Sequence, residues 1–168
     1  MRSWKVLDIR KCMNDMLRQE AFDDFLLAEA AVTTGVSYVI DGHLTKDFFT
    51  GEELEDMGLA GERCARYGTL RPICFDMIKG KRTPQSFQFI FLASAGLIRE
   101  LLEQSRTGLR SQDVSNLSFN VRYVKGELYL TCSATLGIFT PDKSLELAWE
   151  QWICDFMRKL EIPLEQLT

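Results

Sequence analysis

Long apolar runs are absent from this sequence. No segment approaches 18 uninterrupted apolar residues, and the first residues carry no apolar stretch of signal-peptide length. Both absences argue against a membrane protein and favour a cytoplasmic one. Close cysteine pairs are absent as well, and His43 is the only histidine. Because zinc sites are normally built from closely spaced ligand pairs, we expect reduced thiols, no metal and no cofactor.

Complete catalytic motifs are also missing. The serine-nucleophile pattern Gly-x-Ser-x-Gly does not occur. Gly80 does not belong to a phosphate loop, because such a loop opens a helix, whereas Gly80 follows a predicted helix and precedes a predicted strand. We therefore expect a protein that is not an enzyme.

The composition is that of an ordinary globular protein. Of the 168 residues, 46% are apolar and 26% are charged, and eleven Phe, four Tyr and three Trp supply bulky core material. This length is most simply one domain, residues 1–168. The formal net charge of −4 argues against a protein that coats nucleic acid with its whole surface, but it allows a local basic patch.

Hydrophobic periodicity predicts helices mixed with strands. We expect an α+β fold, an antiparallel sheet of five or more strands with helices packed on it. The predicted helices are residues 8–19, 50–57, 70–79, 94–105 and 143–160, and the predicted strands are 28–34, 36–41, 47–49, 85–93, 117–123 and 128–132. Pro72 then falls in the first turn of its helix, where it is tolerated.

Two aromatic residues lie in the middle of apolar patterns, Phe89 in a strand and Trp152 in the last helix. We expect both to be largely buried, so that alanine at either position costs about 3–5 kcal/mol. An exposed Trp152 would instead make the last helix a docking surface.

Four stretches resemble the marker segments of a known family. They are FLLAEAAVTT, VIDGHLTKDFF, LRPICFDMIKGKRTP and IFTPDKSLELAWE. In this order they resemble a bacterial family of unknown function from anaerobic Gram-positive bacteria. The resemblance implies a cytosolic bacterial protein and brings no activity, cofactor or site residue.

A second, weaker likeness concerns the order of elements. Helix, strand, strand and a short third strand occur from Asp8 to Phe49, and the same order recurs from Ser94 to Thr140. The order of a helix followed by a hairpin, twice over, is similar in outline to the sliding clamps of DNA replication, with no clamp motif behind it.

The clearest candidate for binding is a basic segment, residues 62–82. It carries six basic and two acidic residues, so the rest of the chain sums to −8. Such asymmetry suits a phosphate-rich partner, or the charges pair internally with Glu52, Glu53, Glu55 and Asp56. The lysines, glycine and proline around Gly80 are also ordinary signals of a helix end, and we favour that interpretation of this part. The basic residues are Arg63, Arg66, Arg71, Lys79, Lys81 and Arg82.

His43 is the second candidate. Asp41, His43, Lys46 and Asp47 place acids, an imidazole and an amine within seven residues, and a histidine beside a carboxylate can act as a general base. A polar turn after a strand is the plainer interpretation, and we expect His43→Ala to leave the fold intact. A cysteine close to His43 is the one nucleophilic arrangement that the sequence allows.

These observations lead to a binding or adaptor module whose partner is a protein or an anionic ligand. A clamp-like protein that binds nucleic acid through residues 62–82 is the first alternative, and a small enzyme centred on His43 is the second.

Overall fold

The computed structural model describes residues 1–167, which form one eight-stranded antiparallel sheet and five α-helices. The helices are α1 (Ile9–Leu17), α2 (Gly51–Asp56), α3 (Tyr67–Ile78), α4 (Ala95–Ser105) and α5 (Ser144–Lys159). The strands are β1 (Arg2–Val6), β2 (Leu26–Thr33), β3 (Ser37–Asp41), β4 (Ala65–Arg66), β5 (Ser86–Leu92), β6 (Val114–Val124), β7 (Glu127–Leu136) and β8 (Leu164–Gln166). The predicted α+β class is therefore confirmed.

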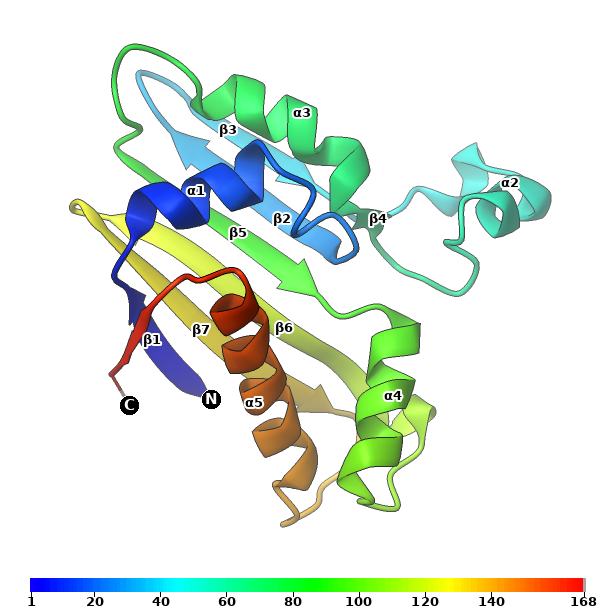
Figure 1. Cartoon of the computed structure of the whole chain (residues 1–168). Helices are drawn as coiled ribbons and strands as arrows, with labels where there is room; N and C mark the ends of the chain where they lie inside the picture. Colours follow the sequence, from blue (N-terminus) through cyan, green and yellow to red (C-terminus); the bar gives the residue numbers. More distant parts are fainter. Residues whose placement is uncertain (168) are drawn as a thin grey trace.

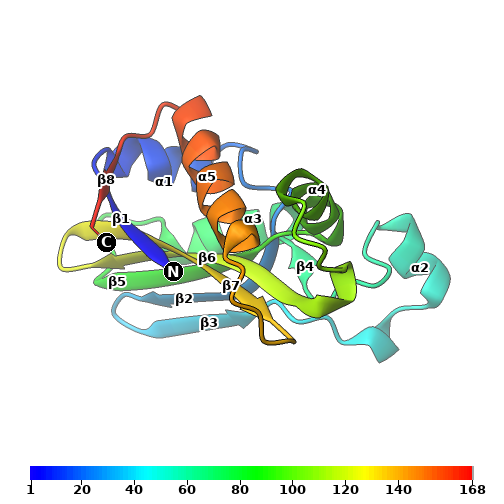
Figure 2. The same ribbon diagram turned by 90° about the horizontal axis from the view of Figure 1, so that it is seen from below.

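The sheet is a single layer covered on one side. Its strand order is β3-β2-β5-β6-β7-β1-β8, with β4 pairing β2 beside β3. Helices α1, α3, α4 and α5 lie on one face of the sheet, while α2 stands apart at one end (Figures 1 and 2). None of the described helices combines the length and the apolar character needed to span a bilayer.

Strand β5 supplies the centre of the core. Phe87, Phe89 and Phe91 point toward the helices and are 0–4% exposed, because alternate residues of a strand share one face. Phe91 stacks on Phe119 of β6, with ring centroids 4.9 Å apart. On the other face of β5, Ile90 is only half-buried, so the second half of this strand is less enclosed than its apolar run suggested.

Local capping signals act as the sequence predicts. Asp8 accepts a hydrogen bond from the Lys11 amide at the start of α1. Thr50 and Glu53 form a reciprocal capping box on α2, and Ser94 caps α4 through the Leu97 amide.

The predicted strand at 47–49 is wrong, because residues Lys46–Phe48 form a 3₁₀ helix with no strand partner. The second predicted repeat also lacks its third strand, since no strand follows β7 before α5 within the described residues. The coarser order of a helix followed by a hairpin does occur twice, as α1 before β2–β3 and as α4 before β6–β7, but this order alone does not show a clamp-like repeat.

Helix α3 begins earlier than expected, at Tyr67 rather than Leu70. The buried Tyr67 hydroxyl donates to the carbonyl of Met16 at 2.9 Å, and this tertiary contact holds the extra turn. Pro72 is consequently inside the helix instead of in its first turn, on an exposed surface. Gly80 lies just past the helix end, as predicted, but without the positive φ of a glycine cap.

Trp152 is half-buried and packs against the core, so it is not the exposed docking residue of the alternative, but it is less enclosed than Phe89. It stacks between Trp149 and Phe156, with centroid distances of 5.6 and 5.4 Å. Trp149 is the fully buried tryptophan of α5, and its indole N–H donates to the Ser118 carbonyl at 2.9 Å.

Because Phe89 is fully buried and Trp152 only half-buried, Phe89→Ala should destabilise the protein by about 3–5 kcal/mol, and Trp152→Ala by clearly less. Urea unfolding followed by circular dichroism measures both values.

Gly42 lies where β3 leaves β2, and the backbone there is very close. A Cβ atom on Gly42 would lie 1.7 Å from the carbonyl oxygen of Leu27, whereas a Cβ on Gly35 would meet nothing within 4 Å. Any side chain at position 42 therefore forces the two strands apart.

We expect Gly42→Ala to cost more than about 3 kcal/mol, through disruption of backbone pairing, and Gly35→Ala to cost under about 1 kcal/mol. Thermal unfolding monitored by circular dichroism tests this pair. Equal melting temperatures for the two variants would contradict this, because they would show that the backbone at Leu27 can move away from the new Cβ without loss of stability.

Candidate functional site

A groove lies between α1 and the loop that joins α3 to β5. It has a volume of about 570 Å³, within the usual range for ligand sites. Its floor is apolar and its rim is basic. The apolar lining residues are Ile9, Met13, Leu17, Phe75, Ile78, Pro84, Phe87 and Tyr123, and the basic ones are Arg10, Arg18, Lys79, Lys81 and Arg82. We refer to this site as the basic groove.

Helix α1 contributes two neighbouring stripes to the groove. Ile9, Met13 and Leu17 recur every four residues and form part of the floor. Arg10 and Arg18 are one position further along the chain, with Asn14 between them, so they follow the same spacing along the rim. Residues four apart lie on one helix face, so one helix supplies both the apolar surface and the charge.

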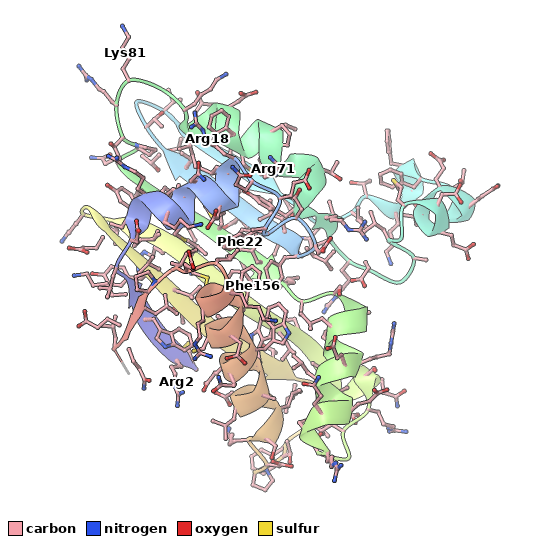
Figure 3. All side chains as sticks on the ribbon, viewed as in Figure 1. Arg2, Arg18, Phe22, Arg71, Lys81 and Phe156 are labelled. Carbon is pink, nitrogen blue, oxygen red and sulfur yellow. The ribbon has the colours of Figure 1, made fainter. Side chains whose placement is uncertain are left out.

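The opposite wall comes from the end of α3 and the loop after it. Lys79 caps the helix, and Lys81 and Arg82 follow it as exposed residues. Figure 3 shows Lys81 at the outer tip of this loop and Arg18 on α1. The sequence prediction of exposed cations near the end of the sheet is thus confirmed, and α1 adds two more.

The charge of the groove is largely unneutralised. No carboxylate lines it, and within residues 1–167 none forms an ion pair with Arg10, Arg18, Lys81 or Arg82. Lys79 contacts Asp76 at 3.0 Å, but both side chains are more than half exposed and such pairs are weak. Since the C-terminal end of α3 carries the negative end of a helix dipole, any attraction for anions must come from the side chains.

Two aromatic contacts brace the site. The Arg18 guanidinium lies over the Phe75 ring, 5.6 Å from its centroid, which connects α1 to α3. Tyr123 stacks on Phe87 with nearly parallel rings, 5.2 Å between centroids. The floor is therefore held by contacts from α1, α3, β5 and β6.

Arg71 does not join the groove. Its guanidinium donates two hydrogen bonds to the Asp23 carboxylate, at 2.8 and 3.2 Å. This bidentate pair fastens α3 to the turn before β2, and it uses the charge internally.

Arg63 and Arg66 lie elsewhere, on and beside β4. Arg63 donates to the backbone carbonyl of Ser115. Arg66 is exposed, and its guanidinium approaches Gly58 beyond α2. Neither residue forms an ion pair with the acids of α2 in the part of the chain that the structure describes. The basic segment thus divides into three places, and only Lys79, Lys81 and Arg82 share one site.

Arg10 and Arg18 were missed by the sequence analysis. Their one signal is the polar stripe at i and i+8 beside the apolar stripe of α1. Such a stripe is ordinary on a surface helix. Only the packing of α1 against α3 gives it a facing surface.

His43 lies at a different, smaller hollow of about 210 Å³ on the uncovered side of the sheet. Its Nδ1 is 2.6 Å from the Asp41 Oδ1, and His43 is paired with Cys64 across an antiparallel bridge. The pKa of Asp41 is lowered, through hydrogen bonds from the His43 backbone and ring. The fold therefore brings the Asp41 carboxylate, the His43 imidazole and the Cys64 thiol near one another.

The Cys64 thiol is poorly suited to act as a nucleophile. It is 0% exposed and packs in a cluster with Leu26 and Leu59. Burial raises the pKa of this thiol, with a smaller opposing effect from Arg63. A buried thiol with a raised pKa is mostly protonated near neutral pH, and the thiolate is the reactive form.

No group of three potential metal ligands exists within the described residues. The carboxylates of α2 are exposed side chains of a capped helix rather than a converging set.

The fold and this groove define a small α+β protein with a groove that is rimmed by basic side chains. It belongs to a family of unknown function, DUF5721, which matches residues 15–165. The match confirms the resemblance to an uncharacterised family. No curated protein and no solved structure matches the chain.

The buried state of Cys64 can be tested by thiol labelling with Ellman's reagent. In the native protein we expect Cys64 to react at least about tenfold more slowly than the half-buried Cys154, because attack requires an accessible thiolate. Cys64→Ser and Cys154→Ser variants assign the two rates. Rapid labelling of Cys64 that is abolished by His43→Ala would instead establish an activated cysteine–histidine pair.

Proposed function

We propose that this protein is a binding module whose basic groove receives an acidic segment of a protein partner that also carries apolar side chains. The observation behind the proposal is the combination of five cations with an apolar floor and no lining carboxylate. A ligand that matches both features needs negative charge around an apolar anchor.

A peptide suits this groove better than a nucleic acid does. The floor is mostly aliphatic, from Ile9, Met13, Leu17 and Ile78, whereas single-stranded nucleic acid is usually held on aromatic stacking platforms along an extended basic track. Arg63, Arg66 and Arg71 lie outside the groove, so the basic track is short. The rest of the chain is acidic and would repel a long phosphate backbone.

We also propose that residues 1–168 act as one domain and that the protein works in the bacterial cytosol. The resemblance noted above supports the bacterial cytosol, and so do the five cysteines, which are all free thiols.

The binding proposal can be tested by fluorescence anisotropy. The probe is a fluorescein-labelled synthetic peptide in which glutamates flank leucine and phenylalanine. We expect saturable binding that weakens with salt, and at least about tenfold weaker binding to the Lys81→Glu, Arg82→Glu variant, because both charges are reversed at the rim. Amide chemical-shift changes should concentrate on α1 and residues 79–84.

Two controls sharpen the test. Arg99→Glu with Lys159→Glu makes the same change in net charge at exposed sites outside the groove lining, and it should bind like the wild type. A probe with serine in place of its apolar residues should bind more weakly. An equal loss of peptide affinity in both double variants would show that the effect comes from the net charge of the protein and not from the groove. Binding of single-stranded or duplex DNA without peptide binding would favour the nucleic-acid alternative and overturn the proposal.

A further inference from the structure

The segment that protrudes from the body is both acidic and partly apolar. It consists of the 3₁₀ helix and α2, residues 46–57, called here the acidic lobe. Phe48 is 78% exposed and Met57 is 39% exposed. The exposed carboxylates of the lobe are those of Asp47, Glu52, Glu53, Glu55 and Asp56, against the single cation Lys46.

Local contacts hold the acidic lobe in a defined position on the molecule. Leu54 packs against the small apolar cluster of Leu26, Leu59 and Cys64, which anchors the lobe to the uncovered side of the sheet. The capping box of Thr50 and Glu53 fixes the start of α2. Among the described residues, no cation forms an ion pair with a carboxylate of the lobe. Its negative charge is therefore as unneutralised as the positive charge of the groove.

The lobe cannot occupy the groove of its own chain. Figures 1 and 2 place α2 at one end of the molecule and the loop between α3 and β5 near the opposite end, beside α1. Leu54 and Leu59 hold the lobe on the strands at its own end. Any contact between lobe and groove is consequently a contact between two molecules.

We propose that the acidic lobe of one copy occupies the basic groove of a second copy. This inference rests on the proposed function, and it names the partner of that site. Five carboxylates face five cations, and the exposed Phe48 ring supplies the apolar anchor for the floor. Because the two surfaces differ, the contact is heterologous, so repetition produces a ring or an open chain of copies.

Sedimentation velocity over a concentration series tests the contact in the full-length protein. We expect the wild type to associate with increasing concentration, and less so at high salt, because the contact is ionic. Reversal of the groove (Lys81→Glu, Arg82→Glu) and reversal of the lobe (Glu52→Lys, Glu55→Lys) should each give monomers. Glu53 is left unchanged because its side chain closes the capping box.

Two further samples decide between a specific contact and a loss of folding: the two variants mixed, and a single chain in which both surfaces are reversed. An equimolar mixture of the two reversed variants, and a single chain that carries all four substitutions, should associate again. The fourfold variant returns to a formal net charge of −4, so restored association is not an effect of overall charge. Circular dichroism checks that each variant is folded.

Several results would overturn the inference: a wild type that stays monomeric, association that survives groove reversal, or no recovery in the fourfold variant. The peptide titration on the same samples separates the two proposals. A monomeric wild type that still binds the acidic probe removes self-association and retains the binding module. A protein that neither associates nor binds the probe removes both.

Discussion

The antiparallel pairing of β5 with β2 and β6 is the interaction on which the rest of the structure depends. It joins the N-terminal hairpin to the C-terminal one, and it places Phe87, Phe89 and Phe91 under the helices. These rings are buried in the core, where burial of apolar surface is the main stabilising contribution. Helices α1 and α3 both pack on this aromatic layer, so its position sets theirs.

The basic groove follows from that arrangement. Burial of Phe87 fixes the start of β5. The first half of α3 is held by the contact of Tyr67 with Met16 and by the Arg71–Asp23 pair, and the Arg18–Phe75 contact lies near its C-terminal end. The loop between α3 and β5 is therefore held at the end of the sheet, next to α1. Its cations face the polar stripe of α1 across an apolar floor.

The acidic residues of the chain outnumber the basic ones, and several of them are gathered on the acidic lobe, away from the basic groove. A protein with net charge −4 that gathers cations on one end and carboxylates on a protruding lobe has complementary surfaces far apart on the same molecule. The uncovered side of the sheet is different in character. There Asp41 and His43 form a polar turn beside the buried Cys64 thiol, which belongs to the small apolar cluster that Leu54 of the lobe packs against.

The sequence by itself determined the elements whose signals are local. Residue spacing and caps predict α1, α4, α5, the β2–β3 and β6–β7 hairpins and β5, because helix and strand periodicity and side-chain capping act within a few residues. Strands β1, β4 and β8 were not predicted, because they are short and form only through pairing with strands distant in sequence, as Trp4 of β1 pairs with Leu130 of β7. The same holds for the site: Lys79, Lys81 and Arg82 are visible as a basic run, but Arg10 and Arg18 join them only when α1 packs beside α3. Tertiary structure alone also assigned Arg71 to Asp23, because a side chain's partner depends on which distant segment the fold brings within a few ångströms.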